Sequence, residues 1–281
     1  MGSRGKERAG WRDGGARRAS LGLAAVTAGG LLSADPAFAG AWTYPAGTGQ
    51  VIVSTILTEG EERLAGRGGA IVRQAYRKAE SNAYLEYGFT DWLTGIAVPD
   101  FQAVSVSAPA AAQYEGLGQS GIGARARIFQ TADSVFSFQA MVAVPPRGHP
   151  VNDAEIGATD FQTEARLLAG HNFQIGAWAA FADAQIAYRA RLGAPADEIH
   201  VDLTLGIRPA LRWLVMLQSF STVSAGPARP PFLRGSEHKL ELSLTYDVSR
   251  HWSVQVGALA TVAARNLMRQ RGMAAALWRR F

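Results

Sequence analysis

The sequence predicts an all-β protein: an antiparallel, up-and-down transmembrane β-barrel of about twelve strands, placed after an N-terminal signal peptide. Three observations predict it. The chain has a basic and then apolar leader, it has segments in which apolar and polar residues alternate with a period of two, and its connections alternate between short and long. None of the 281 residues is a cysteine, which excludes a disulfide scaffold, a thiolate metal site and a cysteine nucleophile.

Residues 1–39 contain the three parts of a cleaved export signal. Residues 1–20 are basic, and the stretch from Leu21 to Leu32 is uncharged. This stretch is too short to cross a bilayer as a helix, which needs ~20 residues. An A-x-A cleavage site follows at Ala37-Phe38-Ala39. We therefore expect a signal peptide at residues 1–39 and an outer-membrane barrel at residues 40–281.

The basic balance of the whole chain comes mainly from this leader. The leader holds six of the 28 basic residues and three of the 23 acidic ones, so residues 40–281 carry 22 and 20. No basic cluster remains that would follow a phosphate backbone, which argues against nucleic acid as a partner. The sequence contains no phosphate-binding glycine motif, zinc-ligand spacing or EF-hand loop, so we expect no cofactor and no metal.

The strands are predicted by alternation. Ile199, Val201, Leu203 and Leu205, for example, are each separated by one polar or charged residue, which gives one apolar and one polar face. No apolar run after Ala39 is long enough for a transmembrane helix. We expect strands at residues 48–58, 71–89, 92–106, 117–129, 134–145, 159–170, 174–191, 198–208, 211–224, 237–247, 252–264 and 269–281.

The connections between these strands alternate in length. An even number of strands returns the C-terminus to the periplasmic side, with short turns there and long loops outside. The short turns are expected at Thr90-Asp91, Thr131-Ala132-Asp133, His171-Asn172, Pro209-Ala210 and Ser249-Arg250, and the long loops at residues 59–70, 107–116, 146–158, 192–197, 225–236 and 265–269. Residues 40–47 form a short periplasmic tail that could fold into the barrel.

Two soluble folds also show alternation, but each fits the chain less well. Strands of a β-sandwich usually have ~5–6 residues, whereas a tilted membrane strand needs ~9–11, and many strands here have 10 or more. A lipocalin-like barrel has about eight strands and an apolar interior. Here one face carries ionic groups on strand after strand. If that face lines the interior, the apolar face contacts lipid.

Aromatic residues lie close to the short turns and on the apolar parity, as in the aromatic girdles of outer-membrane barrels. The chain also ends in an aromatic residue, which resembles the C-terminal strand that the barrel-assembly machinery binds, although Arg279 interrupts the apolar pattern. We expect contacts with outer-membrane lipid and with that machinery. The expected girdle residues are Trp92, Trp178, Tyr188, Trp213, Tyr246, Trp252 and Phe281.

The polar parity places nine acidic side chains and nine Lys or Arg side chains in the interior. A strongly selective channel would show one dominant sign. Balanced charges indicate either ion pairs that satisfy one another and solvent, or a role for some of them in solute binding. The candidate lumen-facing residues are Glu86, Arg125, Arg127, Glu164, Arg166, Asp183, Arg189, His200, Asp202, Arg212, Lys239 and Glu241.

Some outer-membrane barrels hydrolyse lipids, which requires a Ser–His arrangement that lipid can reach. His200 faces inward beside Asp202, and His238 faces outward near a long loop, with Ser236 close in sequence. Neither position singles out a nucleophile. We therefore expect that the chain is not an enzyme.

Two segments carry a resemblance to a known family. They are the hairpin Ala83-Tyr84-Leu85-Glu86-Tyr87-Gly88-Phe89-Thr90-Asp91-Trp92-Leu93-Thr94 and the strand start Gly116-Leu117-Gly118-Gln119-Ser120-Gly121-Ile122-Gly123. Both segments resemble outer-membrane barrels described as transporters of the meta-pathway of phenol degradation. Gln119 stands where this family usually has Asp, so any role of that acid is absent. The resemblance covers residues 83–145 and implies passage of small aromatic or hydrophobic molecules.

The leading expectation from the sequence is a barrel in the outer membrane of a Gram-negative bacterium that passes a small solute through a mixed-charge lumen. Two alternatives remain open. One is a lipid-modifying barrel enzyme, and the other is a structural or adhesive surface barrel whose function would lie in loops 146–158 and 225–236.

Overall fold

The computed structural model describes residues 40–65, 71–107, 111–145, 160–230 and 232–281, with the backbone alone at residues 61–65 and 71–74. The predicted signal peptide at residues 1–39 lies outside this part of the chain and stays a prediction. The long loop predicted at residues 146–158 also lies outside it.

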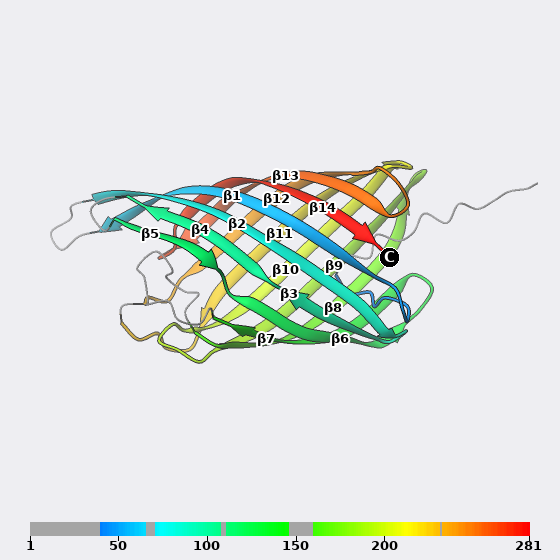
Figure 1. The fold of residues 1–281 in the computed structure, drawn as a ribbon, viewed down its shortest axis with the longest axis horizontal. Helices are drawn as coiled ribbons and strands as arrows, with labels where there is room; N and C mark the ends of the chain where they lie inside the picture. Colours follow the sequence, from blue (N-terminus) through cyan, green and yellow to red (C-terminus); the bar gives the residue numbers. More distant parts are fainter. Residues whose placement is uncertain (1–39, 66–70, 108–110, 146–159, 231) are drawn as a thin grey trace, which may run out of the picture. The chain divides into compact units, whose positions relative to one another are not determined.

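The described chain forms one antiparallel β-barrel (Figure 1). β1 pairs with β2 on one side and with β14 on the other, which closes the sheet on itself. Gln50 lies opposite Arg280, so the barrel begins and ends at the same end. The strands are β1 (Gly49–Ala65), β2 (Ile71–Thr90), β3 (Leu93–Val98), β4 (Asp100–Val106), β5 (Ala112–Leu117), β6 (Ser120–Gln130), β7 (Ser134–Val144), β8 (Gln162–Ile175), β9 (Trp178–Arg191), β10 (Asp197–Ala210), β11 (Trp213–Ala225), β12 (Ser236–Asp247), β13 (Trp252–Arg265) and β14 (Arg269–Arg280).

These fourteen segments make twelve barrel strands, which confirms the predicted fold class. Only Pro99 separates β3 from β4, and only Gly118 and Gln119 separate β5 from β6. Proline has no N–H to donate to the ladder, so a strand is interrupted there. Both halves of the first broken strand pair with β2, while β3 pairs with β6 and β4 pairs with β5.

Two short turns lie a few residues beyond their predicted positions. His171 and Asn172 continue β8, and the turn follows at Gly176, whose φ of +61° is a conformation that glycine adopts without strain. Pro209 and Ala210 belong to β10, although the pairing with β11 is irregular between Ile207 and Ala210, at the proline. Both turns were therefore predicted a few residues too early in the sequence.

Two predicted long loops are shorter than expected because strands extend into them. β1 continues to Ala65 and pairs with β2 along its whole length, although the sequence predicted a loop from residue 59. Ala112–Leu117 forms β5 against β4, where the prediction was a loop at residues 107–116. Charge predicts a loop at residues such as Glu59, but in this barrel Glu59 belongs to β1 and lies opposite Arg77 of β2.

The two faces of the barrel differ in the way the alternation predicts. Large apolar side chains on the outer parity are exposed, among them Leu57 at 56% and Ile122 at 64%. The inner face holds buried polar groups such as Gln50, Glu86 and Thr245. In the part of the chain that the structure describes, no helix has the length and apolarity to span a membrane.

The interior is not uniformly polar, which the sequence pattern did not predict. Phe181, Leu214, Met216 and Trp278 form one buried apolar cluster on the inner face. A second cluster brings Ala41 and Trp42, from the segment before β1, against Val135 and Leu168 of β7 and β8. Because Val135 and Leu168 lie on inward-facing strand positions, the N-terminal segment is folded into the barrel.

Candidate functional site

The interior of the barrel encloses a cavity of about 710 Å³. This volume falls within the ~300–1,000 Å³ that is common for small-molecule sites. Its most frequent lining residue is glutamine, whose amide can both donate and accept hydrogen bonds. The eight glutamines are Gln50, Gln102, Gln119, Gln139, Gln162, Gln185, Gln218 and Gln255.

One interior wall, formed by β8, β9 and β10, carries a chain of ion pairs. Arg166 binds Glu164 at 2.8 Å and Asp202 at 2.5 Å. Arg189 binds the same Glu164 at 2.7 Å and reaches Glu198 at 3.6 Å. Since each arginine is shared between two carboxylates, the wall carries alternating charge and little excess of either sign.

The same chain of ion pairs continues towards the long-loop end. Arg191 binds Glu198 at 3.1 Å and Asp160, which precedes β8, at 2.7 Å. His200 Nε2 lies 3.0 Å from Glu198, and His200 Nδ1 lies 3.2 Å from the Thr222 hydroxyl. Alternation in the sequence placed Arg191, Glu198 and His200 on one face, and the structure shows that they also contact Asp160 and Thr222, which the sequence did not assign to that face.

A separate buried pair lies between β2 and β6. Arg125 donates to Glu86 at 2.8 Å, and each side chain is only 3% exposed. Arg125 also donates to Gln139 at 2.9 Å and to the Tyr84 hydroxyl at 3.2 Å, while Gln50 donates to Glu86 at 2.9 Å. The pair is therefore well hydrogen-bonded, which a buried charge requires.

The N-terminal segment, residues 40–47, occupies the short-turn end of the interior. Ala41, Trp42 and Tyr44 are each at most 6% exposed. The Ala41 N–H donates to Asp183 at 2.8 Å, and the Tyr44 N–H donates to the Thr94 hydroxyl at 2.9 Å. Burial raises the pKa of the Tyr44 hydroxyl, because the charged form would lose its hydration inside the barrel.

Two further bonds tie this segment to the strands around it. Arg125 donates to the Trp42 carbonyl at 3.0 Å, and the Ser137 hydroxyl donates to the Ala41 carbonyl at 2.6 Å. The buried Glu86–Arg125 pair is therefore joined directly to the segment that narrows the lumen.

Two glycines make room for the segment. A Cβ atom on Gly170 of β8 would lie 2.3 Å from the Trp42 ring, and one on Gly88 of β2 would lie 2.3 Å from the Pro45 carbonyl oxygen. Any larger residue at either position would collide with the segment. Gly88 belongs to the hairpin that carries the family resemblance, and its close approach to Pro45 gives a physical reason for glycine there.

Two carboxylates face the cavity without an ion pair in the described residues: Glu241 of β12 and Asp100 at the start of β4. Asp100 is 9% exposed, and its Oδ1 accepts no hydrogen bond from the described protein. The arginines that line the cavity, in contrast, are all paired with carboxylates. Among the described residues that line this cavity, the ionisable side chains without an ion pair are therefore both acidic.

The predicted lumen-facing residues divide into two groups. Six of them line the cavity: Glu86, Arg125, Glu164, Arg166, Arg189 and Glu241. The other six contact other groups instead. Asp183 accepts a hydrogen bond from the N-terminal segment, Asp202 pairs with Arg166, His200 contacts Glu198, and Lys239 pairs with Glu237. Arg127 is hydrogen-bonded to Gln130, and Arg212 is exposed near the Tyr246 hydroxyl.

Reasoning from charge alone missed the uncharged part of the lining. The glutamines share the inward parity with the charged residues, and that parity could have identified them. Tyr84, Met216, Phe220 and Trp278 also line the cavity, so aromatic and thioether surface faces the same space as the amides.

The predicted girdle residues lie on the outer surface or at its edge. The exposed fraction is 53% for Trp92, 48% for Trp178 and Tyr188, 41% for Trp213, 42% for Trp252 and 51% for Phe281. Tyr246 is partly covered because its ring packs against Trp213, with centroids 4.7 Å apart. Trp92 lies in the turn after β2 rather than at the start of a strand.

His238 has a different partner from the one suggested by the sequence. Its Nδ1 lies 2.9 Å from the hydroxyl of Ser221 on β11, and not against Ser236. Ser221 and His238 are directly opposite each other in the ladder. Both occupy the outward parity, so this hydrogen-bonded pair faces away from the lumen.

The chain is similar to known proteins in its structure rather than in its sequence. No protein-family model matches the sequence, and no curated protein matches it. The COG4313 outer membrane channel from Pseudomonas putida F1 has a TM-score of 0.61 and 14% identity, covering 85% of this chain and 97% of that one. The fold is that of an outer-membrane β-barrel.

Two other solved barrels extend the comparison. The translocator domain of autotransporter NalP from Neisseria meningitidis has a TM-score of 0.54 and 11% identity, covering 83% of this chain and 88% of that one. KdgM porin, solved in complex with disordered oligogalacturonate, has a TM-score of 0.49 and 6% identity, covering 83% of this chain and 99% of that one. At 11% identity the likeness to the translocator domain shows the fold alone.

The prediction that the chain is not an enzyme is corrected by these comparisons. Barrels of the same fold include both a channel and an autotransporter translocator domain, which are proteins with different functions. The fold therefore does not exclude catalysis. The prediction was therefore wrong as an inference from the sequence.

Proposed function

We propose that this protein is exported with cleavage of residues 1–39, sits in the outer membrane of a Gram-negative bacterium, and passes a small solute through its lumen. The observation that carries the proposal is the cavity of about 710 Å³ inside a closed barrel, lined by glutamines and paired charges. The exposed apolar outer face and its aromatic residues support contact with lipid, and the C-terminal strand would serve the assembly machinery.

The lining favours a small aromatic solute that carries polar substituents. Tyr84, Phe220 and Trp278 supply aromatic surface, while glutamines such as Gln139 and Gln218 supply donors and acceptors around it. The resemblance of residues 83–145 to the meta-pathway barrels points to the same solute class. A purely hydrophobic molecule in the cavity would leave many of the glutamine amides without hydrogen-bond partners, so the lining disfavours such solutes.

Passage would be restricted by the inward-folded segment at residues 40–47. Its residues fill the short-turn end of the lumen with Trp42 and Tyr44, both buried. We propose that this segment limits the rate of passage and excludes large solutes, which makes the barrel a narrow channel rather than a general porin.

Liposome swelling tests the solute class. Protein reconstituted into liposomes would be challenged with arbutin, a neutral aromatic glycoside that crosses bilayers poorly, and with maltose, a sugar of comparable size without an aromatic ring. The proposal predicts faster entry of arbutin than of maltose. Equal slow rates with both solutes, indistinguishable from empty liposomes, would refute the proposed transport.

A second candidate function is a lipid-acting enzyme, favoured by the Ser221–His238 pair. A hydroxyl hydrogen-bonded to an imidazole on the outer face is the minimal arrangement for a serine nucleophile that lipid can reach. Among the described residues no carboxylate contacts His238, so the third group of a triad is missing. Lipid product analysis of the wild type and of Ser221→Ala distinguishes this function, because a hydrolase would lose its products in the variant.

A structural or adhesive role, the third possibility from the sequence, would depend on the long loops. Residues 146–158 lie outside the described chain, and among the described residues of 225–236 no contact favours this role over the other two.

A further inference from the structure

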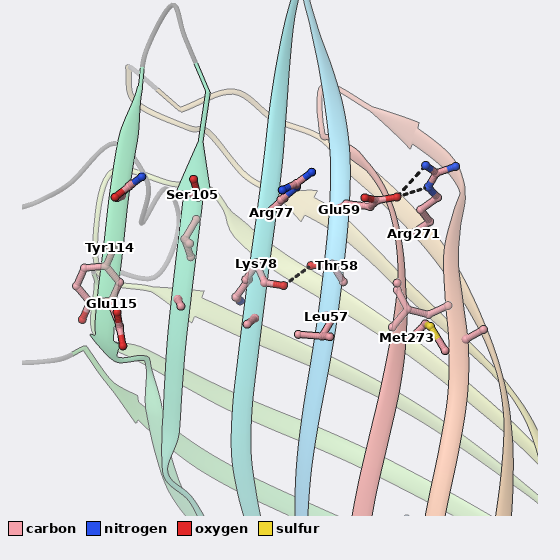
Figure 2. Close-up of a pocket in the computed structure, with 17 residues that line it drawn as sticks. Leu57, Thr58, Glu59, Arg77, Lys78, Ser105, Tyr114, Glu115, Arg271 and Met273 are labelled. Atoms are coloured by element: carbon pink, nitrogen blue, oxygen red, sulfur yellow. Dashed lines mark hydrogen bonds and ion pairs between the residues drawn. The ribbon is translucent and has the colours of Figure 1, made fainter.

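The outer wall of the barrel carries a second cavity that the solute pathway does not use. Its volume is about 940 Å³, and it extends over β13, β14, β1, β2, β4 and β5 (Figure 2). Several of its lining residues lie on the outward face of their strands. Leu57, for example, is 56% exposed and Met273 is 69% exposed. We call this feature the outer groove.

Apolar side chains form the lower part of the outer groove. Leu57 and Met273 are joined there by three small residues, Ala79, Ala103 and Ala258. The small residues leave a hollow between the larger side chains, where other parts of the barrel surface carry bulkier groups such as Leu203 and Ile186. A hollow lined in this way accommodates a hydrocarbon chain.

Charged residues form the upper part of the groove. Glu59 of β1 lies directly opposite Arg77 of β2 and Arg271 of β14 in the ladder. Figure 2 shows Arg77, Glu59 and Arg271 side by side across these three strands. Arg271 is bound to Glu59 at 2.7 Å and is still 79% exposed, while Arg77 forms no ion pair within the described residues. The row therefore has an excess positive charge.

The height of this row matches the outer membrane interface. Tyr87 lies near the short-turn end of β2, and Arg77 is ten residues further along the strand. At ~2.4 Å of rise per residue for a strand tilted by ~45°, this separation is about 24 Å, close to the ~25 Å apolar band of these barrels. The arginines thus lie where lipid headgroups begin, and the apolar hollow lies below them.

Glu115 of β5 is the other carboxylate of the groove. It is two strands away from Arg77, about 10 Å at ~4.8 Å per strand, and it aligns with Ala79 rather than with the arginine row. An anion held between Arg77 and Arg271, which are also two strands apart, would meet their two guanidinium groups and the Glu59 carboxylate between them, which is already paired with Arg271.

From this arrangement we propose that the outer groove binds a phosphate-bearing lipid of the outer leaflet. The phosphate sits between Arg77 and Arg271, which donate charge-assisted hydrogen bonds to it. One acyl chain runs down the hollow past Ala79 and Met273. The bound lipid belongs to the membrane and not to the transported solute, so this site is independent of the proposed channel.

Native mass spectrometry of the purified barrel in detergent tests the site with three probes. They are dilauroyl phosphatidic acid, dilauroylglycerol, which lacks the phosphate, and inorganic phosphate, which lacks the chains. The proposal predicts one tightly bound phosphatidic acid and weak binding of the other two. Equal binding of dilauroylglycerol would mean an apolar contact only, and equal binding of inorganic phosphate would mean an ion site only; either result overturns the proposal.

Two kinds of variant locate the site. The double variant Arg77→Gln/Arg271→Gln should bind phosphatidic acid about 30-fold more weakly, because each basic residue near a lipid surface contributes about fivefold. Arg250→Gln, at an exposed arginine in the turn before β13, is the matched control and should bind normally.

A variant that fills the hollow tests the acyl contact. Ala79→Trp should also weaken binding, whereas Ala184→Trp, on the outer face of β9, should not. Heat-modifiable gel migration shows which variants are folded, and the arginine variants change only exposed side chains. Unchanged affinity in the folded double variant would overturn the proposal whatever Ala79→Trp does.

Discussion

Replacing Trp42 by alanine should release the segment that narrows the lumen. Trp42 is 6% exposed and packs against Leu168 inside the barrel. Removing a buried tryptophan side chain removes about 3–5 kcal/mol from the state in which it is docked. At 1.4 kcal/mol per factor of ten, the docking equilibrium of residues 40–47 should shift towards the released state by a factor of roughly 10² to 4 × 10³.

A second variant should also release residues 40–47, this time by a change in β8, against which Trp42 packs. A Cβ on Gly170 would lie 2.3 Å from the Trp42 ring, so Gly170→Val should displace the ring without changing the segment itself. Trp92→Ala is the matched control, because the Trp92 side chain is 53% exposed, whereas Trp42 is buried inside the barrel.

Single-channel recording in planar bilayers measures the effect. Trp42→Ala and Gly170→Val should both show longer or more frequent openings to a higher conductance level, and Trp92→Ala should behave as the wild type. If Trp42→Ala and Gly170→Val give conductance traces identical to the wild type while migrating as folded barrels, the segment does not restrict the lumen and the reasoning is refuted.

Two further predictions concern the charges of the interior. Arg125→Met leaves Glu86 buried without its cation and should lower the free energy of unfolding by about 3–5 kcal/mol, measured by urea unfolding of the reconstituted barrel; an unchanged midpoint would contradict the buried pair. Glu241→Gln removes an unpaired lumen carboxylate and should reduce the preference for potassium over chloride in reversal-potential measurements, whereas Glu237→Gln, at a carboxylate bound to Lys239, should change it less; the opposite ranking would contradict the assignment.

The architecture could be predicted from the sequence because its signal is repeated on every strand. The alternation along Ile199, Val201, Leu203 and Leu205 fixes two faces, and the strand lengths select a membrane barrel over a sandwich. Proline and glycine explain the errors of detail. Pro99 breaks one strand into β3 and β4, and Gly176, rather than His171, makes a turn.

The contents of the lumen were less predictable. Parity placed Glu164 and Arg166 on the inner face, but their partner Asp202 is 36 residues from Arg166 and depends on strand register. The docking of Trp42 against Leu168 could not be derived from alternation, because it joins a segment outside the strands to an inward position of β8. Alternation in a sequence predicts which face of a strand a side chain occupies. Contacts across the interior depend in addition on strand register and on how the sheet closes into a barrel.

The central claim, that solute passes through the lumen, is tested most directly by two adjacent substitutions on β11. Gln218 lines the cavity, and Leu217 is 49% exposed on the outer face. In planar bilayers Gln218→Trp should reduce conductance because the indole narrows the cavity, while Leu217→Trp should leave conductance unchanged. Equal conductance for both folded variants and the wild type would contradict the claim.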